Sequence, residues 1–501
     1  MDSKKIGFIL GPAIFITMLI LPAPEGMEVA AWRVAAIALL MATWWITEAI
    51  PIAATALLPI LLFPTLQIMS SAATTASYAD HVIYLFMGGF FLAVTMERWN
   101  LHRRIALVIL KLAGDTPSRL IMGFVGATTF LSMWISNTAT AVMMVPIGIS
   151  VVSQVMGSRD GAVVGEKKSK YETNFAKSLV LAIAYAASIG GFITIIGTPT
   201  NIIMAGILDR TFGIQIGFAQ WMLVSVPTSL TLLICMYLLL TKVIFPTGDF
   251  KFASGKDVVN QEMAKLGPMT KAEKLVLLVG LIMATSWIFR EFIIRIPALS
   301  MVTDTTIAML GTTLLFLLPA CKDGERLLNW ETAVKIPWSV VLLFGGGLTL
   351  ASGFERTGLA AWVAGNLTHL SGVHILLFVF IIVLIVNTLT EFMSNTAIAT
   401  LFVPVMGAAA IAMGFHPFAA IVSTTIASTF SFMMPVATPP NAIAFGSGYL
   451  HIKDMAKTGI FLNIIAQVVC VIIIVYLLPI VWNVDISVVP PELLEYYQTQ
   501  P

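Results

Sequence analysis

Long apolar runs separated by short polar connections make up most of the chain. A helix needs about 20 apolar residues to cross the hydrocarbon core of a bilayer. Eleven runs near that length occur, at about 6–22, 30–47, 52–69, 81–97, 178–207, 222–245, 275–294, 303–320, 338–354, 415–449 and 458–482. The pattern predicts eleven membrane crossings joined by short loops.

Two further apolar stretches, at about 120–150 and 372–410, have the wrong length for this scheme. The first has 31 residues, too many for one crossing and too few for two. Basic residues flank the first stretch on both sides, from Arg98 to Arg119 and from Arg159 to Lys177. Since Lys and Arg collect on the cytoplasmic side, both of its ends should be cytoplasmic. We therefore predict one re-entrant hairpin over residues 118–150 and a second over 372–410.

Both predicted hairpins carry the same polar tripeptide. Ser136-Asn137-Thr138 recurs as Ser394-Asn395-Thr396, 258 residues later. The segment Leu85–Leu101 aligns without a gap with Leu343–Leu359 at the same offset. Two aligned blocks that share one offset predict a duplicated structural unit.

The distribution of basic residues sets the expected orientation of the two repeats. With a cytoplasmic N-terminus, only five of the 28 Lys and Arg residues lie outside: Arg33, Arg210, Arg290, Arg295 and Arg356. Five crossings separate the two tripeptides, and because this number is odd the second hairpin should enter from the external face. The repeats are therefore predicted to be inverted in topology, with an external C-terminus.

The expected organisation has five parts. They are an N-terminal first span (1–29), a first repeat (30–245), a cytoplasmic linker (246–271), a second repeat (272–483) and an external tail (484–501). The resulting fold class is an all-α polytopic membrane protein with about 11 transmembrane helices plus two re-entrant hairpins in an inverted-topology repeat.

Composition agrees with a membrane protein and excludes other classes. With 58% hydrophobic and 11% charged residues, the chain is unlike a water-soluble globule, in which about a quarter of residues are charged. The net charge of +2 gives no sign of nucleic-acid binding, and three cysteines form neither a disulfide framework nor a metal-ligand spacing. Lys4 and Lys5 before the first apolar run could belong to a signal peptide, but no small-residue cleavage site follows, so we interpret this run as a span. We expect a bacterial inner membrane because neither a transit peptide nor an external glycosylation sequence is apparent.

A third pair of related motifs interrupts two of the apolar runs. These are GTPTN at Gly197–Asn201 and ATPPN at Ala437–Asn441. Proline removes a helical donor and keeps the preceding residue out of the α conformation, so each helix should be broken there. In transporters, the N-terminal ends of such half-helices face anionic groups, and the unwound carbonyls coordinate Na⁺. The alternative is that these polar residues only hold helices together through hydrogen bonds.

The charge pattern then restricts the ligand. The stretches 120–150, 179–208, 385–415 and 418–450 contain no Lys, Arg or His, and their only carboxylate is Glu391. Hydroxyls, amides and helix ends suit an anion, but neutralising a dianion requires mobile cations, of which Na⁺ is the abundant hard one. Two Na⁺ would balance a dianion, and a third would couple uptake to the membrane potential. Glu391 could be a coupling or proton group, but a structural role is favoured. For Glu48 we likewise favour a position at a helix end over a transport role.

Together, the paired SNT motifs, GTPTN, ATPPN and the segment WWITEAIP at Trp44–Pro51 resemble the divalent anion/Na⁺ symporter family. Members of that family carry dicarboxylates, citrate or sulfate. The resemblance covers essentially the whole chain. It implies a homodimer in which a transport domain moves across the membrane against a scaffold domain, as an elevator does.

The same resemblance implies the residues of the site. The first Na⁺ site would use Ser132, Ser136, Asn137 and Gly197, and the second would use Thr390, Met393, Asn395 and Ala437, with backbone carbonyls from Met393 and Ala437. The substrate would be bound by Ser136, Asn137, Thr138, Thr198, Pro199, Ser394, Asn395, Thr396, Thr438 and Pro439. The two cation sites can differ in affinity, because Gly197 is matched by Ala437 and Ser132 by Thr390.

The expected function is Na⁺-coupled symport of a divalent anion, with C4-dicarboxylates such as succinate, malate or fumarate as the leading substrates. Citrate or sulfate transport and Na⁺-independent exchange are the alternatives within the family. An ion channel is a different class and would need a continuous pore. The polar motifs offer hydroxyls but no base to activate them, so we expect no enzyme and no catalytic residue.

Overall fold

A computed structural model of the chain describes residues 3–114, 116–157, 170–247, 255–321, 324–367 and 372–499. Helices dominate these ranges, and the β pairing within them is one isolated bridge between Pro319 and Arg326. Eight helices in the described ranges are long and apolar enough to cross a membrane. The all-α membrane fold is therefore confirmed, whereas the count of eleven crossings and the repeat boundaries stay predictions.

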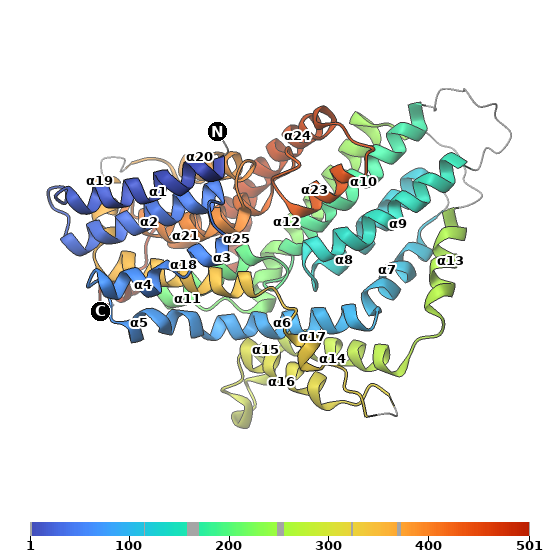
Figure 1. Cartoon of the computed structure of the whole chain (residues 1–501), viewed down its shortest axis with the longest axis horizontal. Coiled ribbons are helices and arrows are strands. Elements are labelled where there is room, and N and C mark those ends of the chain that lie inside the picture. The colour runs from blue at the N-terminus through green and yellow to red at the C-terminus, as the bar shows by residue number, and fades with distance from the viewer. Residues whose placement is uncertain are drawn as a thin grey trace.

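Figure 1 shows the order of the helices along the chain. In the N-terminal half they are α1 (Ser3–Ile20), α2 (Val29–Thr47), α3 (Ile52–Thr55), α4 (Leu58–Thr65), α5 (Ser71–Ala76), α6 (His81–Arg98), α7 (Leu101–Leu112), α8 (Pro117–Ser132), α9 (Asn137–Gly157), α10 (Lys170–Phe192), α11 (Pro199–Phe212) and α12 (Phe218–Leu238), the last extended by a π-helical turn (Leu239–Ile244).

The second half begins with the linker helix α13 (Gly255–Leu266). There follow α14 (Lys271–Ile288), α15 (Arg290–Ile293), α16 (Asp304–Leu317), α17 (Trp330–Ala333), α18 (Trp338–Arg356), α19 (Leu359–Leu367), α20 (Ile375–Thr390), α21 (Asn395–Ala412), α22 (Pro417–Thr429), α23 (Pro439–Gly446), α24 (Ile452–Ile472), α25 (Leu478–Trp482) and α26 (Pro491–Thr499). Short 3₁₀ turns lie at Ser77–Ala79 and Pro297–Leu299, and a π-helical turn joins α24 to α25 at Ile473–Leu477.

Helix α10 lies at the centre of the larger hydrophobic core. Every side chain from Ser178 to Phe192 is buried, and the helix packs against α8, α9, α12 and α23. Close packing is possible because its residues are small. A Cβ atom on Gly190 would lie 2.7 Å from the carbonyl oxygen of Thr129, so α8 and α10 meet backbone to backbone there. This fixed packing sets the depth at which the C-terminal end of α10 stops.

The two proline-containing pentapeptides break their helices, as predicted. Helix α10 stops at Phe192 and α11 starts at Pro199, while α22 stops at Thr429 and α23 starts at Pro439. The asparagine that ends each pentapeptide satisfies carbonyls freed by the break. Asn201 donates to the Phe192 and Thr194 oxygens, and Asn441 to those of Ser431 and Met434.

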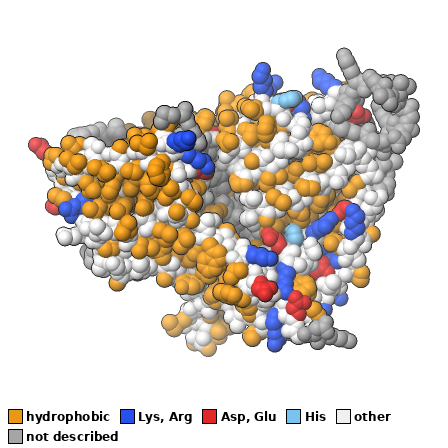
Figure 2. Space-filling view, in the orientation of Figure 1, with side chains coloured by type: hydrophobic (Ala, Val, Ile, Leu, Met, Phe, Trp, Pro, Cys, Tyr) orange, Lys and Arg blue, Asp and Glu red, His pale blue; other side chains and the backbone are white. Residues whose placement is uncertain are grey.

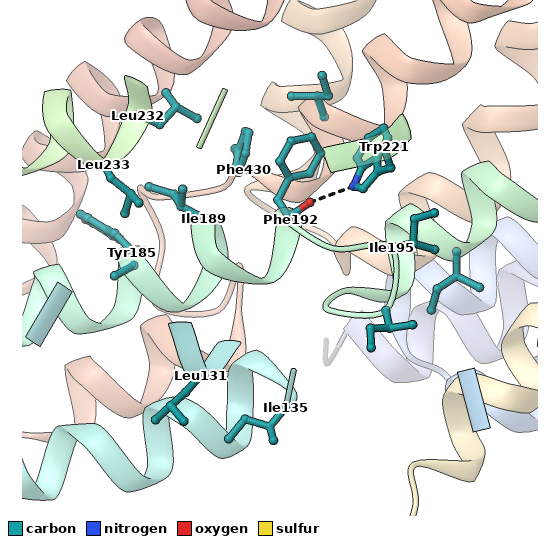
Figure 3. Close-up of a cluster of buried hydrophobic side chains, with 14 of the residues drawn as sticks. Leu131, Ile135, Tyr185, Ile189, Phe192, Ile195, Trp221, Leu232, Leu233 and Phe430 are labelled. Atoms are coloured by element: carbon teal, nitrogen blue, oxygen red, sulfur yellow. Dashed lines mark hydrogen bonds between the residues drawn. The ribbon is translucent and has the colours of Figure 1, made fainter. Parts of the chain in front are cut away.

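Aromatic side chains enclose the first break. The indole N–H of Trp221 in α12 also donates to the Phe192 oxygen, and Phe192 packs edge-on against Phe430 from the second break (Figure 3). The unwound backbone is therefore buried in protein, as the absence of water at membrane depth requires.

The apolar run 52–69 differs from the single crossing that was predicted. It forms two short helices, α3 and α4, and α4 has only eight residues. Pro51 and Pro59 each remove a backbone donor, and the freed Ala56 carbonyl accepts from the Tyr78 hydroxyl. A Cβ on Gly346 would lie 2.4 Å from the same oxygen, so α18 covers the break closely. Tertiary contacts therefore stabilise an interruption that hydropathy alone does not reveal.

A second, smaller hydrophobic cluster lies apart from the α10 core. It joins α2, α4, α18 and α19, which occupy the left of Figure 1, whereas α8, α9 and α10 lie on the right. Figure 2 shows the surface hollowed between these two parts. Orange apolar side chains cover much of the face in that view, and charged side chains gather at its lower right.

Candidate functional site

A cavity of about 1170 Å³ lies where the two tripeptides and the two pentapeptides meet. Its wall contains all ten predicted substrate-binding residues: Ser136, Asn137, Thr138, Thr198, Pro199, Ser394, Asn395, Thr396, Thr438 and Pro439. Three predicted cation ligands, Gly197, Met393 and Ala437, also line it. Residues as far apart in sequence as Ser136 and Pro439, 303 positions, thus line one space.

Four helices begin at the wall of this cavity. Helix α9 starts at Asn137, α11 at Pro199, α21 at Asn395 and α23 at Pro439, and each of these residues lines the space. The first turn of a helix has N–H groups without intrahelical partners and carries the positive end of the helix dipole. Four such ends around one cavity favour an anion.

In the first predicted cation site, three oxygen atoms lie close together but one hydroxyl hydrogen is available to form hydrogen bonds between them. The Ser132 hydroxyl lies 2.7 Å from Asn137 Oδ1 and 2.7 Å from the Ala187 carbonyl oxygen. A hydroxyl has one hydrogen, so it can donate to only one of these acceptors. Three close oxygens with one shared proton are the arrangement that a hard cation stabilises.

The second predicted cation site repeats this arrangement. Thr390 Oγ1 lies 2.6 Å from Asn395 Oδ1 and 3.0 Å from the Ser428 oxygen. The Ser431 hydroxyl lies 3.2 Å from the same Asn395 oxygen. We name the two groups the first and second oxygen sets: Ser132, Asn137 and Ala187 form the first, and Thr390, Asn395, Ser428 and Ser431 the second.

The predicted cation ligands divide between the cavity wall and the layer behind it. Ser132 and Thr390 are fully buried behind the tips, whereas Asn137 and Asn395 belong both to the cavity wall and to an oxygen set. The Ser136 hydroxyl accepts from the Ala139 N–H at the start of α9.

Glycines shape the first set. A Cβ on Gly191 would lie 2.1 Å from Asn137 Oδ1, and one on Gly197 would lie 2.3 Å from the Gly191 carbonyl oxygen. The two pentapeptides are 240 residues apart, so the counterparts of Gly191 and Gly197 in the second repeat are Ser431 and Ala437. The departure from symmetry seen in sequence thus has a steric cause, because the first half has no room for the side chains that the second half carries.

Charged residues also reach the cavity, and of these only Glu48 was considered for a transport role from the sequence. Lys4, Glu48, Glu97 and Lys335 line it, from the start of α1, the end of α2, the end of α6 and the turn before α18. Lys4 and Glu48 lie 3.8 Å apart. The two bases and two acids balance in formal charge, so they provide no net charge for a dianion.

The Glu391 carboxylate anchors the second unwound segment. It accepts from the backbone N–H groups of Phe432, Met433 and Met434 and from the Asn463 side-chain amide. These donors form hydrogen bonds with both carboxylate oxygens, and the bonds hold in place the backbone that follows α22. The structural interpretation of Glu391 is therefore favoured by its contacts.

The chain matches one protein-family model, described as the sodium:sulfate symporter transmembrane region, over residues 3–483. It is similar to the sodium-dependent dicarboxylate transporter SdcS of Staphylococcus saprophyticus, with 42% identity over 489 residues, 97% of this chain and 93% of that protein. SdcS of Staphylococcus aureus strain USA300 shows the same identity and coverage.

Two solved structures resemble the fold. MtrF of Neisseria gonorrhoeae, from a class of antimetabolite efflux pumps, has a TM-score of 0.57 and 12% identity, covering 98% of this chain and 97% of that one. The YdaH transporter of Alcanivorax borkumensis has a TM-score of 0.53 and 10% identity, covering 96% and 97%. At such low identities the likeness shows the fold alone.

Proposed function

The chain belongs to the sodium:sulfate symporter family, and from this premise we propose that it couples Na⁺ to the transport of dicarboxylates. Its family and relatives are transporters and not enzymes. The 42% identity to SdcS, whose name states sodium-dependent dicarboxylate transport, supports this substrate class over sulfate.

The observation that carries the proposal is an anion cavity whose fixed side-chain charges sum to zero. Four helix N-termini face the space, and the residues of its tripeptides and pentapeptides are all uncharged. Partial charges at helix ends amount to about half an elementary charge each and do not neutralise a dianion in a low-dielectric site. Cations in the two oxygen sets would supply the missing charge directly beside the tips.

Coupling follows from the shared asparagines. Asn137 and Asn395 would bind Na⁺ through their side-chain oxygens and face the substrate with their helix N-termini. A cation would therefore fix the tip that the anion must contact, and the anion would stabilise the bound cation. We take C4-dicarboxylates such as succinate, malate and fumarate as substrates and at least two Na⁺ as coupling ions.

The carrier would move these ligands as a homodimer by an elevator motion. Support for this comes from the family resemblance and from the cavity's position between the α10 core and the smaller cluster of α2, α4, α18 and α19. The C-terminal end of α2 and the turn before α18 would then be the fixed wall past which the two tips slide.

Uptake of labelled succinate into proteoliposomes tests the proposal. Uptake should require an inward Na⁺ gradient and disappear when K⁺ replaces Na⁺. Unlabelled succinate should compete strongly, while citrate, sulfate and glutamate at the same concentration should compete weakly. Uptake that persists without Na⁺ would contradict symport and favour exchange, and competition by sulfate alone would contradict the substrate class. Liposomes without protein give the background.

A further inference from the structure

The two unwound segments touch each other at a buried pair of hydroxyls. Thr200 Oγ1, in the first turn of α11, lies 2.7 Å from Thr429 Oγ1, the last residue of α22. The residues are 1% and 2% exposed, so water does not replace this bond. Beside the pair, Phe192 and Phe430 pack with ring centres 5.1 Å apart (Figure 3). This is a direct polar contact between the two halves of the chain.

The neighbouring hydrogen bonds determine which of the two threonine hydroxyls is the donor. Thr429 Oγ1 also lies 2.7 Å from the Thr425 carbonyl oxygen, which can only accept. Thr429 therefore uses its one hydrogen on that carbonyl, and Thr200 must donate to Thr429. Thr198 Oγ1 lies 3.5 Å from Thr200 Oγ1 and lines the cavity. A chain of hydroxyls thus runs from the cavity wall of the first half into α22 of the second.

Thr429, at the far end of this series of hydroxyls, contacts the second oxygen set through its backbone. The Thr429 carbonyl accepts from Asn395 Nδ2 at 3.1 Å, and the preceding Ser428 carbonyl lies 3.0 Å from Thr390 Oγ1. Thr429 therefore contacts the first half through its side chain and the second oxygen set through its backbone. A cation that draws Asn395 and Ser428 together would also shift the acceptor of Thr200.

We propose that the Thr200–Thr429 hydroxyl pair couples cation binding at the second oxygen set to anion binding at the first pentapeptide. The two threonines act as positioning residues, and neither needs to touch a ligand. The inference rests on the proposed Na⁺ and dicarboxylate binding. Linkage requires that the factor by which Na⁺ strengthens succinate binding equals the factor by which succinate strengthens Na⁺ binding. Loss of the hydroxyl pair should reduce both by the same amount.

Thr200→Val and Thr429→Val test this, because valine keeps the shape and removes the hydroxyl. Binding of succinate to the purified full-length protein would be measured at low and at saturating Na⁺, and binding of Na⁺ at zero and saturating succinate. In each variant the coupling factor, the factor by which one ligand strengthens binding of the other, should fall by about fivefold or more. The affinity for either ligand, measured with the other ligand saturating, should change less. The double variant should match the single ones, since both remove the same bond.

Thr425→Val is the matched control. Thr425 lies one turn earlier in α22 and is fully buried, and among the described residues its hydroxyl bonds to the Ile421 carbonyl of its own helix. It should keep the wild-type coupling factor. Thr429→Ser retains a hydroxyl and should restore coupling if Thr429→Val proves unstable.

Two results would overturn the inference separately from the proposed function. Wild-type coupling retained in both valine variants would remove the role of the pair while leaving Na⁺-dependent transport intact. A wild-type protein that binds succinate equally well in Na⁺ and K⁺ would remove the proposed function, and the inference with it.

Discussion

At the scale of single residues, each tip asparagine belongs both to the cavity wall and to an oxygen set, whereas the hydroxyl behind it belongs to the oxygen set. Asn137 lines the cavity and contacts Ser132, which is fully buried. Ser132→Ala should therefore raise the half-saturating Na⁺ concentration about tenfold, because one interaction with a charged ligand contributes roughly 1.5 kcal/mol, and leave succinate affinity at saturating Na⁺ nearly unchanged. Asn137→Ala should weaken both, in uptake assays that vary each solute.

A serine on the same hairpin provides the control for this prediction. Ser150 in α9 is exposed, and its hydroxyl bonds to the Pro146 carbonyl of its own helix. Ser150→Ala should leave both half-saturation values unchanged. A Ser132→Ala variant with wild-type Na⁺ activation would contradict the assignment of the first oxygen set.

The absence of a side chain at Gly191 is itself part of the site. In Gly191→Ala, the new methyl group would meet Asn137 Oδ1 at 2.1 Å, well inside contact distance, and would push the tip amide away. We expect Na⁺ activation to shift by more than about tenfold, with loss of succinate binding. Gly126→Ala in α8, where the nearest atom is 4.0 Å away, should transport normally. Equal activity of the two variants would show that the tip tolerates displacement.

Sequence reasoning could identify tip residues but not every atom that meets them. The repeated tripeptides carry their own signal, whereas Ser431 is matched in the first half by a glycine and the carbonyls of Ala187 and Ser428 have no residue signature. Lys335 reaches the cavity through the turn before α18, far from any motif. Such contacts are set by tertiary packing, which a repeat in the chain does not encode.

At the scale of helices, Arg104 of α7 contacts both the end of the linker helix α13 and the first turn of α14. The Arg104 guanidinium donates to both Glu273 oxygens, at 2.6 and 3.2 Å, and to the carbonyls of Leu266 and Gly267 that end α13. Arg104→Ala should destabilise the protein by about 3 kcal/mol, since it leaves a buried carboxylate unpaired. Thermal unfolding in detergent should report a lower melting temperature. Lys111→Ala, on the exposed side of α7, should not change it.

This clamp should also depend on pH. Burial raises the pKa of Glu273, but hydrogen bonds from Arg104 and from the Thr270 N–H and hydroxyl outweigh it and hold the pKa below its usual value. A lowered pKa gives stability that is complete above the unfolded value of about 4.3 and is lost as pH falls through the folded value. The protection factor of amide hydrogen exchange in the last turn of α13, which takes the slower intrinsic exchange in acid into account, should therefore decrease below pH of about 4. In Arg104→Ala this protection factor should be low at all pH values, and a wild-type protection factor that persists in acid would contradict the clamp.

Helix boundaries were predictable where local chemistry determines them. The prolines of the two pentapeptides stand at the start of α11 and α23, and the predicted breaks lie directly before them. The run 52–69 reads as one apolar span, yet it divides into α3 and α4 because Tyr78 and Gly346 cover the exposed carbonyl of Ala56. Those partners are 22 and 290 residues away from Ala56 in sequence, so no local sequence pattern predicts the break.

At the scale of the whole molecule, the cavity lies between two packed bodies that contact each other through small residues. Helix α18 contributes to both hydrophobic clusters, and α21, which carries the second tripeptide at its start, contributes Ala397 to the smaller one. They meet at Gly347 and Thr400, where a Cβ built on Gly347 lies 3.6 Å from the Thr400 Cβ. An elevator motion would require α21 to slide past α18, and so would separate these two positions.

A disulfide at this contact therefore tests the motion directly. The Cβ separation of 3.6 Å falls within the range of about 3.5–4.5 Å that a disulfide needs. In a background with Cys235, Cys321 and Cys470 replaced, oxidation of Gly347→Cys/Thr400→Cys should abolish succinate uptake, and a reductant should restore it. Each single cysteine variant under the same oxidant should transport at its reduced rate, which separates cross-linking from damage. Full transport by a completely cross-linked protein would mean that α18 and α21 move as one body, and the moving boundary would then have to lie elsewhere among the helices around the cavity.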